Sequence, residues 1–146
     1  MSLRISRYTI YTIGKARKRW IKEGIYSYLK RLPGLTIKEL RDSNQRKEAL
    51  AIKTASARDE ILIALSEEGE DLSSAQLLEK LNQFESKRIA FAIGGADGLD
   101  SQIKESANMV LGLSRMTFPH EIALLLLIEQ IYRAQSISKG TPYHRE

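Results

Sequence analysis

The sequence predicts an α/β fold with a mainly parallel sheet flanked by helices on both faces. Short apolar runs of strand length alternate with segments of helical periodicity along the whole chain. Two of these runs, residues 60–65 and 88–93, are almost continuously apolar, as expected for strands covered on both faces. Such alternation is typical of parallel strands joined by crossover helices. With 146 residues and no repeat or low-complexity tract, a single domain spanning residues 1–146 is expected.

The N-terminal half of the chain supplies two predicted strands and two predicted helices. In the first helix Trp20 is expected to face the core, and Pro33-Gly34 ends the helical pattern. In the second helix Leu50 belongs to a weak apolar face. In chain order, these elements are a strand over residues 3–13, a helix over 20–32, a strand over 35–40 and a helix over 45–56.

The rest of the chain, from residue 60, supplies three strands and three helices. Ser73 and Gln76 have the spacing of a capping box at the start of one helix. Asp100 is a candidate cap for a short helix, and Pro119 suits the first position of the last one. In chain order, the strands cover residues 60–65, 88–93 and 109–113, and the helices cover 73–84, 100–107 and 119–136.

Composition excludes several classes of site. The chain has no cysteine, which rules out disulfides, thiolate catalysis and cysteine-based zinc sites, and with only His120 and His144 no metal site is expected. Residues 1–7 lack the apolar core of a signal peptide. The longest apolar run, residues 122–128, is far shorter than the ~20 residues that cross a bilayer. We therefore expect a cytoplasmic protein with no membrane partner.

The charge balance favours a polyanionic partner. The formal net charge is +5, and neutralising phosphates with basic side chains releases counterions. Basic residues concentrate between Lys15 and Lys22, around Trp20. This cluster predicts either a solvated helix face or a contact with RNA.

Three loops are expected at the carboxyl ends of strands, where open α/β sheets bind ligands. They cover residues 66–71, 94–99 and 114–118, and the second holds Gly94, Gly95 and Gly98, which allow close approach of the backbone. The spacing is neither a Rossmann fingerprint nor a P-loop. On its own, this segment favours a tight turn over a cofactor loop.

The segment before the last helix carries small polar residues and an arginine. Ser114, Arg115 and Thr117 can present hydrogen bonds to a nucleoside, although Thr117 can instead cap the helix that follows. His120, in the first helical turn, is expected to be a surface or capping residue.

The C-terminal tail ends in residues that are unusual for a terminus. Tyr143 can stack on a base, His144 can move a proton and Arg145 can bind phosphate. The alternative is a frayed tail without function, which these residues alone slightly favour.

Taken together and in this order, these segments resemble the RlmH-type SPOUT methyltransferases over nearly the whole chain. The glycine segment alone is weakly specific, whereas the full set with this ending is highly specific. The matching residues are Ile13-Gly14-Lys15, Trp20, Gly24, and residues 28–31, 91–99, 113–120, 129–134 and 142–146.

The resemblance implies a SPOUT (α/β-knot) fold with a C-terminal trefoil knot, and a homodimer whose cofactor loops lie near the subunit interface. It implies S-adenosylmethionine-dependent methylation of N3 of a pseudouridine in 23S ribosomal RNA, on assembled ribosomes. Tyr143, His144 and Arg145 would be the catalytic residues facing the base. The implied cofactor-binding residues are Leu65, Gly94, Gly95, Leu113, Ser114, Arg115, Met116, Thr117 and Phe118.

Two positions depart from the family pattern. Leu124 stands where the family usually has Arg, and Ser66 where it usually has Asp. Leu124 removes a polar contact expected from the last helix, for which Arg115 or Arg133 are candidates to compensate. Ser66 lies beside Leu65, so the edge of the cofactor pocket is expected to differ in detail.

The expected reaction is an in-line methyl transfer with reacting atoms about 3–3.5 Å apart. The imide nitrogen is a poor nucleophile while protonated, which makes His144 the candidate general base. Two alternatives stay open: a SPOUT enzyme acting on another RNA such as transfer RNA, and a non-catalytic RNA- or ribosome-binding factor. A metal hydrolase using His120 and Glu121 has too few ligands.

Overall fold

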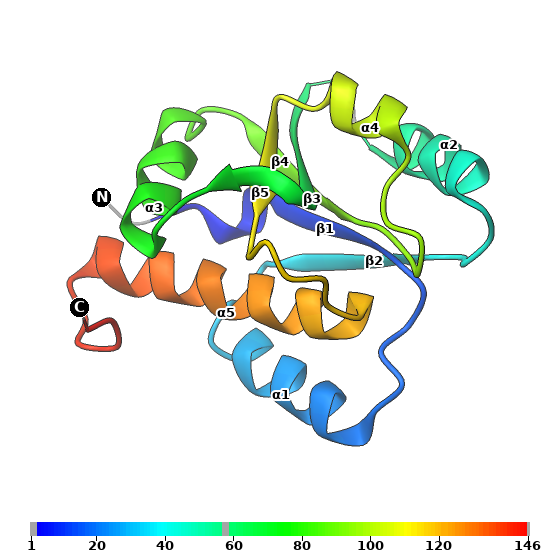
Figure 1. Ribbon diagram of the computed structural model, residues 1–146. Helices are drawn as coiled ribbons and strands as arrows, with labels where there is room; N and C mark the ends of the chain where they lie inside the picture. Colours follow the sequence, from blue (N-terminus) through cyan, green and yellow to red (C-terminus); the bar gives the residue numbers. More distant parts are fainter. Residues whose placement is uncertain (1–2, 57–58, 146) are drawn as a thin grey trace.

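A computed structural model describes residues 3–56 and 59–145, which form a five-stranded sheet with helices on both faces (Figure 1). Residues 1–2, 57–58 and 146 lie outside this description, including Glu146 at the end of the tail motif. The elements are, in chain order, η1 (Ile5–Arg7), β1 (Tyr8–Ile13), α1 (Arg19–Leu29), β2 (Thr36–Leu40), α2 (Gln45–Ala55), β3 (Glu60–Asp71), α3 (Ser74–Gln83), β4 (Arg88–Ile93), α4 (Ser101–Ser106), β5 (Met109–Gly112) and α5 (His120–Lys139).

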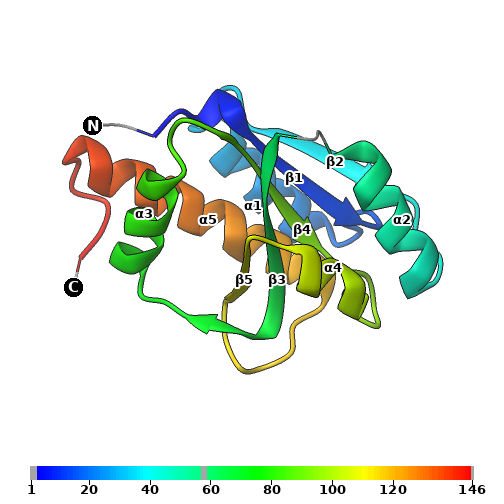
Figure 2. The ribbon, with the colours of Figure 1, turned by 90° about the horizontal axis from the view of Figure 1, so that it is seen from above.

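The strands are parallel in every pairing and follow the order β2-β1-β4-β3-β5 (Figure 2). This confirms the predicted fold class. In register, Ile10 of β1 lies between Ile37 of β2 and Phe91 of β4. Strand β4, which carries the glycine segment at its end, therefore lies in the middle of the sheet. All five carboxyl ends point to one edge.

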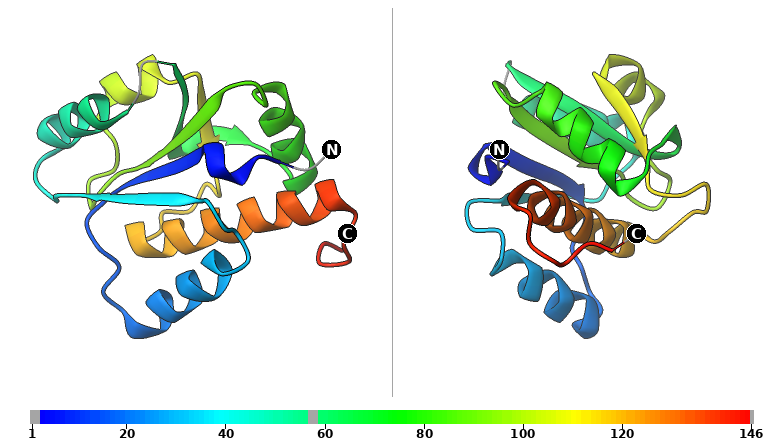
Figure 3. Two further views of the ribbon diagram at one scale, coloured as in Figure 1. Left: turned by 180° about the vertical axis from the view of Figure 1, so that it is seen from behind. Right: turned by 90° about the vertical axis from the view of Figure 1, so that its left-hand side faces the viewer.

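Successive residues of β4 face opposite sides of the sheet, as the two-residue period of a strand requires. Ile89 and Phe91 belong to a larger apolar cluster that includes side chains of α1, α3 and α5. Ala90 and Ala92 belong to a smaller cluster formed with α2 and α4. Figure 3 shows α1 and α5 on one side of the sheet and α2 and α4 on the other. The central strand is thus covered on both faces, which explains its nearly continuous apolar sequence.

Helix α5 runs from the carboxyl ends of the strands back to their amino ends. Its first residue, His120, lies next to Gly14 just beyond β1, whereas Gln135 hydrogen-bonds the main chain of Leu3 before β1. The helix continues past its predicted end near residue 136 and stops at Gly140, whose left-handed conformation (φ 72°) forms the C-cap. Pro119 is the N-cap residue and not the first helical residue.

Three local predictions are wrong, one about secondary structure and two about which side chains are buried. Residues 5–7 form a 3-10 helix and not a strand, because the amide of Arg7 bonds the carbonyl of Arg4. Trp20 and Leu50 are 60% and 65% exposed, so neither side chain belongs to the core. In α1 the buried positions are instead Ile21 and Ile25.

Strand β3 is longer than the sequence predicts. The segment expected as a loop, residues 66–71, continues the strand, and its register against β5 shifts between Leu65 and Glu70. Gly69 makes this possible, because a Cβ there would lie 2.5 Å from the carbonyl carbon of Leu111. Residues 66–71 therefore pair with β5 and also lie at the carboxyl edge of the sheet, where ligands bind.

Candidate active site

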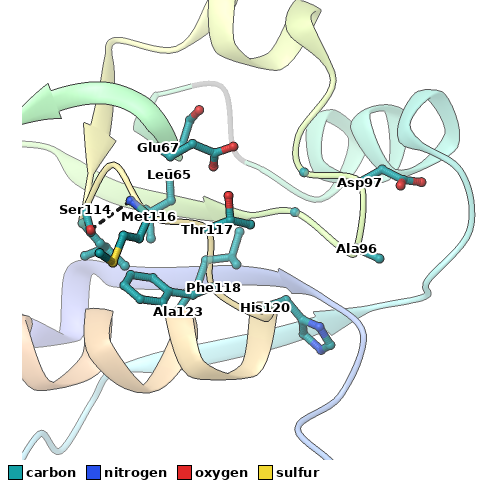
Figure 4. Close-up of a pocket in the computed structure, with 16 residues that line it drawn as sticks. Leu65, Glu67, Ala96, Asp97, Ser114, Met116, Thr117, Phe118, His120 and Ala123 are labelled. Carbon is teal, nitrogen blue, oxygen red and sulfur yellow. Dashed lines mark hydrogen bonds between the residues drawn. The ribbon is translucent and has the colours of Figure 1, made fainter.

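Residues 65–67 of β3 and the segments that follow β4 and β5 meet at the carboxyl edge of the sheet and enclose a pocket of about 210 Å³ (Figure 4). The three segments are those predicted from the carboxyl-end rule. All but one of the residues assigned by resemblance to the cofactor line this pocket, namely Leu65, Gly94, Gly95, Leu113, Ser114, Met116, Thr117 and Phe118.

Arg115 is the predicted residue that does not line the pocket. Its guanidinium instead pairs with the carboxylate of Asp71 at 3.2 Å, and both side chains are exposed. The turn around it is held by the hydroxyl of Ser114, which accepts from the amide of Met116 at 3.0 Å (Figure 4). Arg115 thus lies outside the pocket, and its side chain makes an exposed ion pair beside it.

The glycine segment is folded tightly against itself. A Cβ on Gly94 would lie 2.4 Å from the carbonyl carbon of Gly98, a distance that real Cβ atoms do not adopt. Gly98 has a positive φ of 75°, and its amide donates to the carbonyl of Gly95 at 3.0 Å. Gly94 is therefore required by close approach and Gly98 by backbone conformation, so the segment is both a tight turn and a wall of the pocket.

The pocket lining combines apolar surface with free hydrogen-bonding groups. Leu65, Ile93 and Phe118 supply the apolar part. In the described part of the chain, the main-chain amides of Ala96 and Thr117 have no hydrogen-bond partner. Carboxylate side chains of the lining residues Glu67 and Asp97 add negative charge. This arrangement suits a ligand with a flat apolar part, hydrogen-bond acceptors and a positive charge.

The N-terminus of α5 fixes the loop after β1 beside the pocket. Glu121 accepts from the main-chain amides of Arg17 at 2.6 Å and Lys18 at 3.3 Å, and these bonds lower the pKa of its carboxyl group. Nε2 of His120, which also lines the pocket, donates to the carbonyl of Lys15 at 3.3 Å. His120 is thus part of a structural anchor and not a free surface residue.

A carboxyl pair lies behind the glycine segment. A Cβ on Gly95 would lie 3.3 Å from Oδ1 of Asp42 and 3.5 Å from Oε1 of Glu48. Burial raises the pKa of Glu48, the amide of Ser43 opposes this by donating at 2.8 Å, and Asp42 raises it further. The glycine segment therefore rests on a carboxyl group that holds its proton more tightly than usual.

The C-terminal tail is docked on the second half of α5. The hydroxyl of Tyr143 donates to Oε2 of Glu129 at 2.8 Å and accepts from the hydroxyl of Tyr28 at 2.9 Å. Its ring meets that of Tyr132 edge-on, with centroids 4.7 Å apart. Burial raises the pKa of Tyr143, and the bonds to Tyr28 and Glu129 raise it further. The tyrosine hydroxyl therefore stays protonated at neutral pH and anchors the tail.

An ion pair on α5 holds the histidine of the tail. Arg133 binds the carboxylate of Glu129 through Nη2 at 2.6 Å, and its Nη1 donates to Nδ1 of His144 at 3.1 Å. The guanidinium also lies over the ring of Tyr143, 4.8 Å from the centroid. Arg145 is exposed. We call Tyr28, Glu129, Tyr132, Arg133, Tyr143 and His144 the tail cluster.

The pocket contacts the N-terminal end of α5 through His120 and Ala123, whereas the tail cluster is built on its second half around Glu129 and Arg133. Figure 1 shows the C-terminal tail at the opposite end of α5 from its first turn. A helix rises about 1.5 Å per residue, so His120 and Arg133 lie roughly 20 Å apart along its axis. The expectation that the tail lies beside the cofactor loops is therefore not met within one chain. The sequence predictions also omit Glu129 and Tyr28 as site residues. For Glu129, the sequence offers one indication: its i,i+4 spacing from Arg133 predicts an ion pair on the helix surface.

Other predicted features have clear positions. Leu124, the departure in α5, is buried in the larger apolar cluster, so it makes no polar contact. The indole of Trp20 lies exposed among the basic residues of α1 and the loop before it. Within residues 3–56 and 59–145, no group of three or more potential metal ligands occurs, and no helix is long and apolar enough to span a membrane.

Known proteins resemble this chain in sequence and in fold. Residues 6–144 match the family described as "Predicted SPOUT methyltransferase". A curated relative from Synechococcus sp. (strain CC9605), "Ribosomal RNA large subunit methyltransferase H", is 56% identical over 140 residues, which cover 96% of this chain and 97% of the relative. A relative of the same name from Prochlorococcus marinus (strain NATL1A) is 54% identical over 144 residues and 99% of both chains.

Among solved structures, a probable methylase family protein from Haemophilus influenzae Rd KW20 superposes with a TM-score of 0.60 at 12% identity, over 96% of this chain and 71% of that one. The TrmH/SpoU tRNA modifying enzyme of A. aeolicus gives a TM-score of 0.52 at 14% identity, over 99% and 84%. At these identities the solved structures show a shared fold.

Proposed function

Because the chain belongs to the SPOUT methyltransferase family, we propose that it transfers the methyl group of S-adenosylmethionine to N3 of a pseudouridine in 23S ribosomal RNA, in the cytoplasm. The pocket at the carboxyl edge of the sheet carries this proposal, since it gathers the residues that the resemblance assigns to the cofactor. The names of the curated relatives, which match nearly the whole chain, support ribosomal RNA as the substrate. A trefoil knot remains an expectation of the family resemblance.

The pocket suits S-adenosylmethionine, which supplies an electrophilic methyl group on a positively charged sulfur. Leu65, Ile93 and Phe118 offer apolar surface for the adenine ring, and the unpaired amides of the glycine and 113–118 segments offer donors to its nitrogens. The carboxylate of Glu67 lies among the lining residues and favours a bound cation. The adenine ring and the sulfonium thus each have a matching group in the pocket.

The tail that completes the site comes from a second copy of the chain in this proposal. A two-fold axis across the middle of α5 would bring the tail cluster of each copy to the pocket of the other, although the two lie roughly 20 Å apart within one chain. Such a dimer has two identical composite sites. Tyr143, His144 and Arg145 of one copy then face the base next to the cofactor of the other.

Exposed apolar side chains beside the pocket support a dimer. Met116 is 74% exposed, and Leu126 on α5 is also exposed. Leu126 lines a shallow groove together with Leu72 and Leu113. Contiguous apolar surface of this kind marks protein interfaces, and this groove borders the pocket that needs a second tail.

The protein binds its RNA through positive charge. The net charge of +5, the guanidinium of Arg145, and the basic residues between Lys15 and Lys22 provide phosphate contacts. The exposed indole of Trp20 offers a stacking surface for an unpaired base. The main task of these contacts is to position N3 within about 3–3.5 Å of the methyl carbon.

Three measurements test the proposal. Purified protein should transfer a labelled methyl group from S-adenosylmethionine to 50S subunits or 70S ribosomes from cells lacking the gene, and mass spectrometry should locate one added methyl on a pseudouridine of 23S RNA. Transfer RNA as acceptor tests the other RNA substrate. Calorimetry with S-adenosylmethionine tests the non-catalytic alternative, which requires no affinity for the donor. Methylation of transfer RNA alone, or absent donor binding, would overturn the proposal.

A further inference from the structure

The contact between Arg133 and His144 determines which ring nitrogen of the histidine carries the proton. Nη1 of Arg133 lies 3.1 Å from Nδ1 of His144. A guanidinium has donors only, so Nδ1 must accept this hydrogen bond with its lone pair. The proton of the neutral imidazole is then on Nε2. A doubly protonated ring would lose the bond and bring two cations into contact.

The arginine cannot easily move away from this position. Its Nη2 binds Oε2 of Glu129 at 2.6 Å and its Nε binds Oε1 at 3.4 Å, and the two side chains are only 23% and 18% exposed. The hydroxyl of Tyr143 donates to the same carboxylate at 2.8 Å, while the ring of Tyr143 lies against the guanidinium. The carboxylate of Glu129 and the hydroxyl and ring of Tyr143 thus fix the direction in which Arg133 donates.

We propose that Arg133, held by Glu129, is a positioning residue that keeps His144 in the Nε2–H tautomer, so that His144 donates a hydrogen bond to the target base and does not remove its proton. This inference rests on the proposed function, because it assigns a role to His144 at the base. It replaces the general-base role that the sequence suggests for this residue.

The chemistry of the base gives such a donor a task. N3 lies between two carbonyl groups, and when its proton is lost to water the negative charge spreads onto both oxygens. An N–H group aimed at one of these oxygens stabilises the anion. The N3 lone pair then forms the bond to the methyl carbon, and the electrons of the broken sulfur–carbon bond stay on sulfur. No protein group needs to accept the proton.

Nitrogen-15 NMR tests the tautomer without reference to activity. The chain has only His120 and His144, so the spectrum of His144→Gln assigns the signals. Long-range proton–nitrogen correlations in the intact protein should show Nδ1 of His144 as an unprotonated acceptor and Nε2 as protonated. Arg133→Gln should give a mixture of tautomers. Arg31→Gln is the matched control, because Arg31 lies over the Tyr132 ring of the same cluster and has no bond to His144.

Kinetics separate a donor from a base. Glutamine places an amide N–H near the position of Nε2 but cannot act as a base. His144→Ala should lower kcat by about 100-fold or more, the usual effect of losing one such donor, whereas His144→Gln should stay within about tenfold of the wild type. Arg133→Gln should lower kcat by about 100-fold with an unchanged KM for the donor, as misplacement of a reacting group does. Arg133→Lys, which keeps the charge but not the fork, should recover part of the loss.

The outcomes are distinct. A protonated Nδ1 in the wild type, an unchanged tautomer in Arg133→Gln, or equal losses in His144→Ala and His144→Gln would each overturn the inference. The expected tautomer combined with full activity of His144→Ala would instead remove the tail from the reaction, and this would contradict the proposed function. Circular dichroism of each variant checks that the fold is retained.

Discussion

The two ends of α5 hold sites built on different principles. At its N-terminus the pocket is enclosed by tightly folded main chain and apolar side chains, and Gly94 leaves no space for even one more carbon atom. At its C-terminus the tail cluster is formed by long side chains that hold one another through hydrogen bonds and an ion pair. The first site depends on close packing of the backbone, and the second depends on hydrogen bonds and an ion pair between side chains. Substitutions at the first site should therefore abolish ligand binding through steric overlap, whereas those at the second should weaken the docking of the tail.

The largest expected effects are the losses of activity in a pocket variant and in a tail variant, and the partial recovery of activity when these two variants are mixed. Gly94→Ala should abolish donor binding, because its Cβ would lie 2.4 Å from the carbonyl carbon of Gly98, and His144→Ala should lose about 100-fold in kcat. Mixed dimers, however, keep one intact pocket facing one intact tail. Co-refolding the two variants in equal amounts should therefore restore about a quarter of wild-type activity, since half of the dimers are mixed and each has one working site.

Methyl transfer to ribosomes measures this recovery. Each variant refolded alone is the control, and light scattering verifies that both form dimers. Gly140→Ala tests for general damage by a substituted glycine: with φ 72° and nothing within 4 Å of its Cβ, it should lose about 1 kcal/mol of stability and no donor affinity. If mixing restores nothing although mixed dimers form, pocket and tail do not meet across the dimer.

The binding of RNA and the binding of the donor should also respond differently to salt. Binding of RNA by a chain of net charge +5 depends on phosphate contacts, so its affinity should fall by at least about tenfold between 50 and 200 mM salt. Donor affinity should change by less than about twofold, because the pocket is formed mainly by main-chain and apolar groups. Calorimetry for the donor and filter binding for an RNA fragment measure how steeply each affinity falls with salt concentration. Equal slopes would show that charge controls both sites.

Removing one hydroxyl should weaken the tail cluster by a smaller amount. Tyr143→Phe loses the bonds to Glu129 and Tyr28 but keeps the ring contacts. A loss of about 1 kcal/mol in docking corresponds to roughly a fivefold lower kcat. Amide hydrogen exchange of Thr141 and residues 143–145 should accelerate accordingly, while exchange in the glycine segment stays the same. Unchanged exchange in the tail would mean that ring packing alone docks it.

The smallest expected effect is on stability at the pocket end. Burial raises the pKa of Glu48, so its contribution to stability is present at acidic pH and is lost as the pH rises through the folded-state value. Glu48→Gln should therefore increase the free energy of unfolding at pH 8 and have little effect near pH 4. Urea titrations at both pH values measure this.

Glu121 provides the opposite control, because hydrogen bonds from Arg17 and Lys18 lower its pKa. Its contribution is present at neutral pH and is lost as the pH falls. Glu121→Gln should destabilise the protein at pH 8, and the same sign for both variants would contradict these assignments.

Local patterns in the sequence account for most of the fold and for one half of the site. The capping box of Ser73 and Gln76 and the cap at Asp100 form as predicted. The convergence of the glycine segment with residues 113–118 follows from the carboxyl-end rule for parallel sheets. These features depend on residues close in sequence or on general rules of strand direction.

The features that escape prediction depend on distance or on close backbone contact. Periodicity predicts α5 three residues short of its end at Lys139, and it does not show that the pocket and the tail contact different halves of this helix. The contact of Arg133 with His144 requires the chain to turn back after Gly140, and no pattern specifies that path. The extension of β3 beyond Leu65 depends on the space that Gly69 leaves for β5.

The close passage of Gly69 along β5 has a mechanical consequence. A Cβ on Gly112 would in turn lie 3.1 Å from the carbonyl oxygen of Gly69, so the two backbones touch with no side chain between them. Residues 66–71 and the segment that leaves β5 therefore cannot shift independently. A ligand that immobilises either wall should slow the hydrogen exchange of both, and the pocket would open and close as one unit.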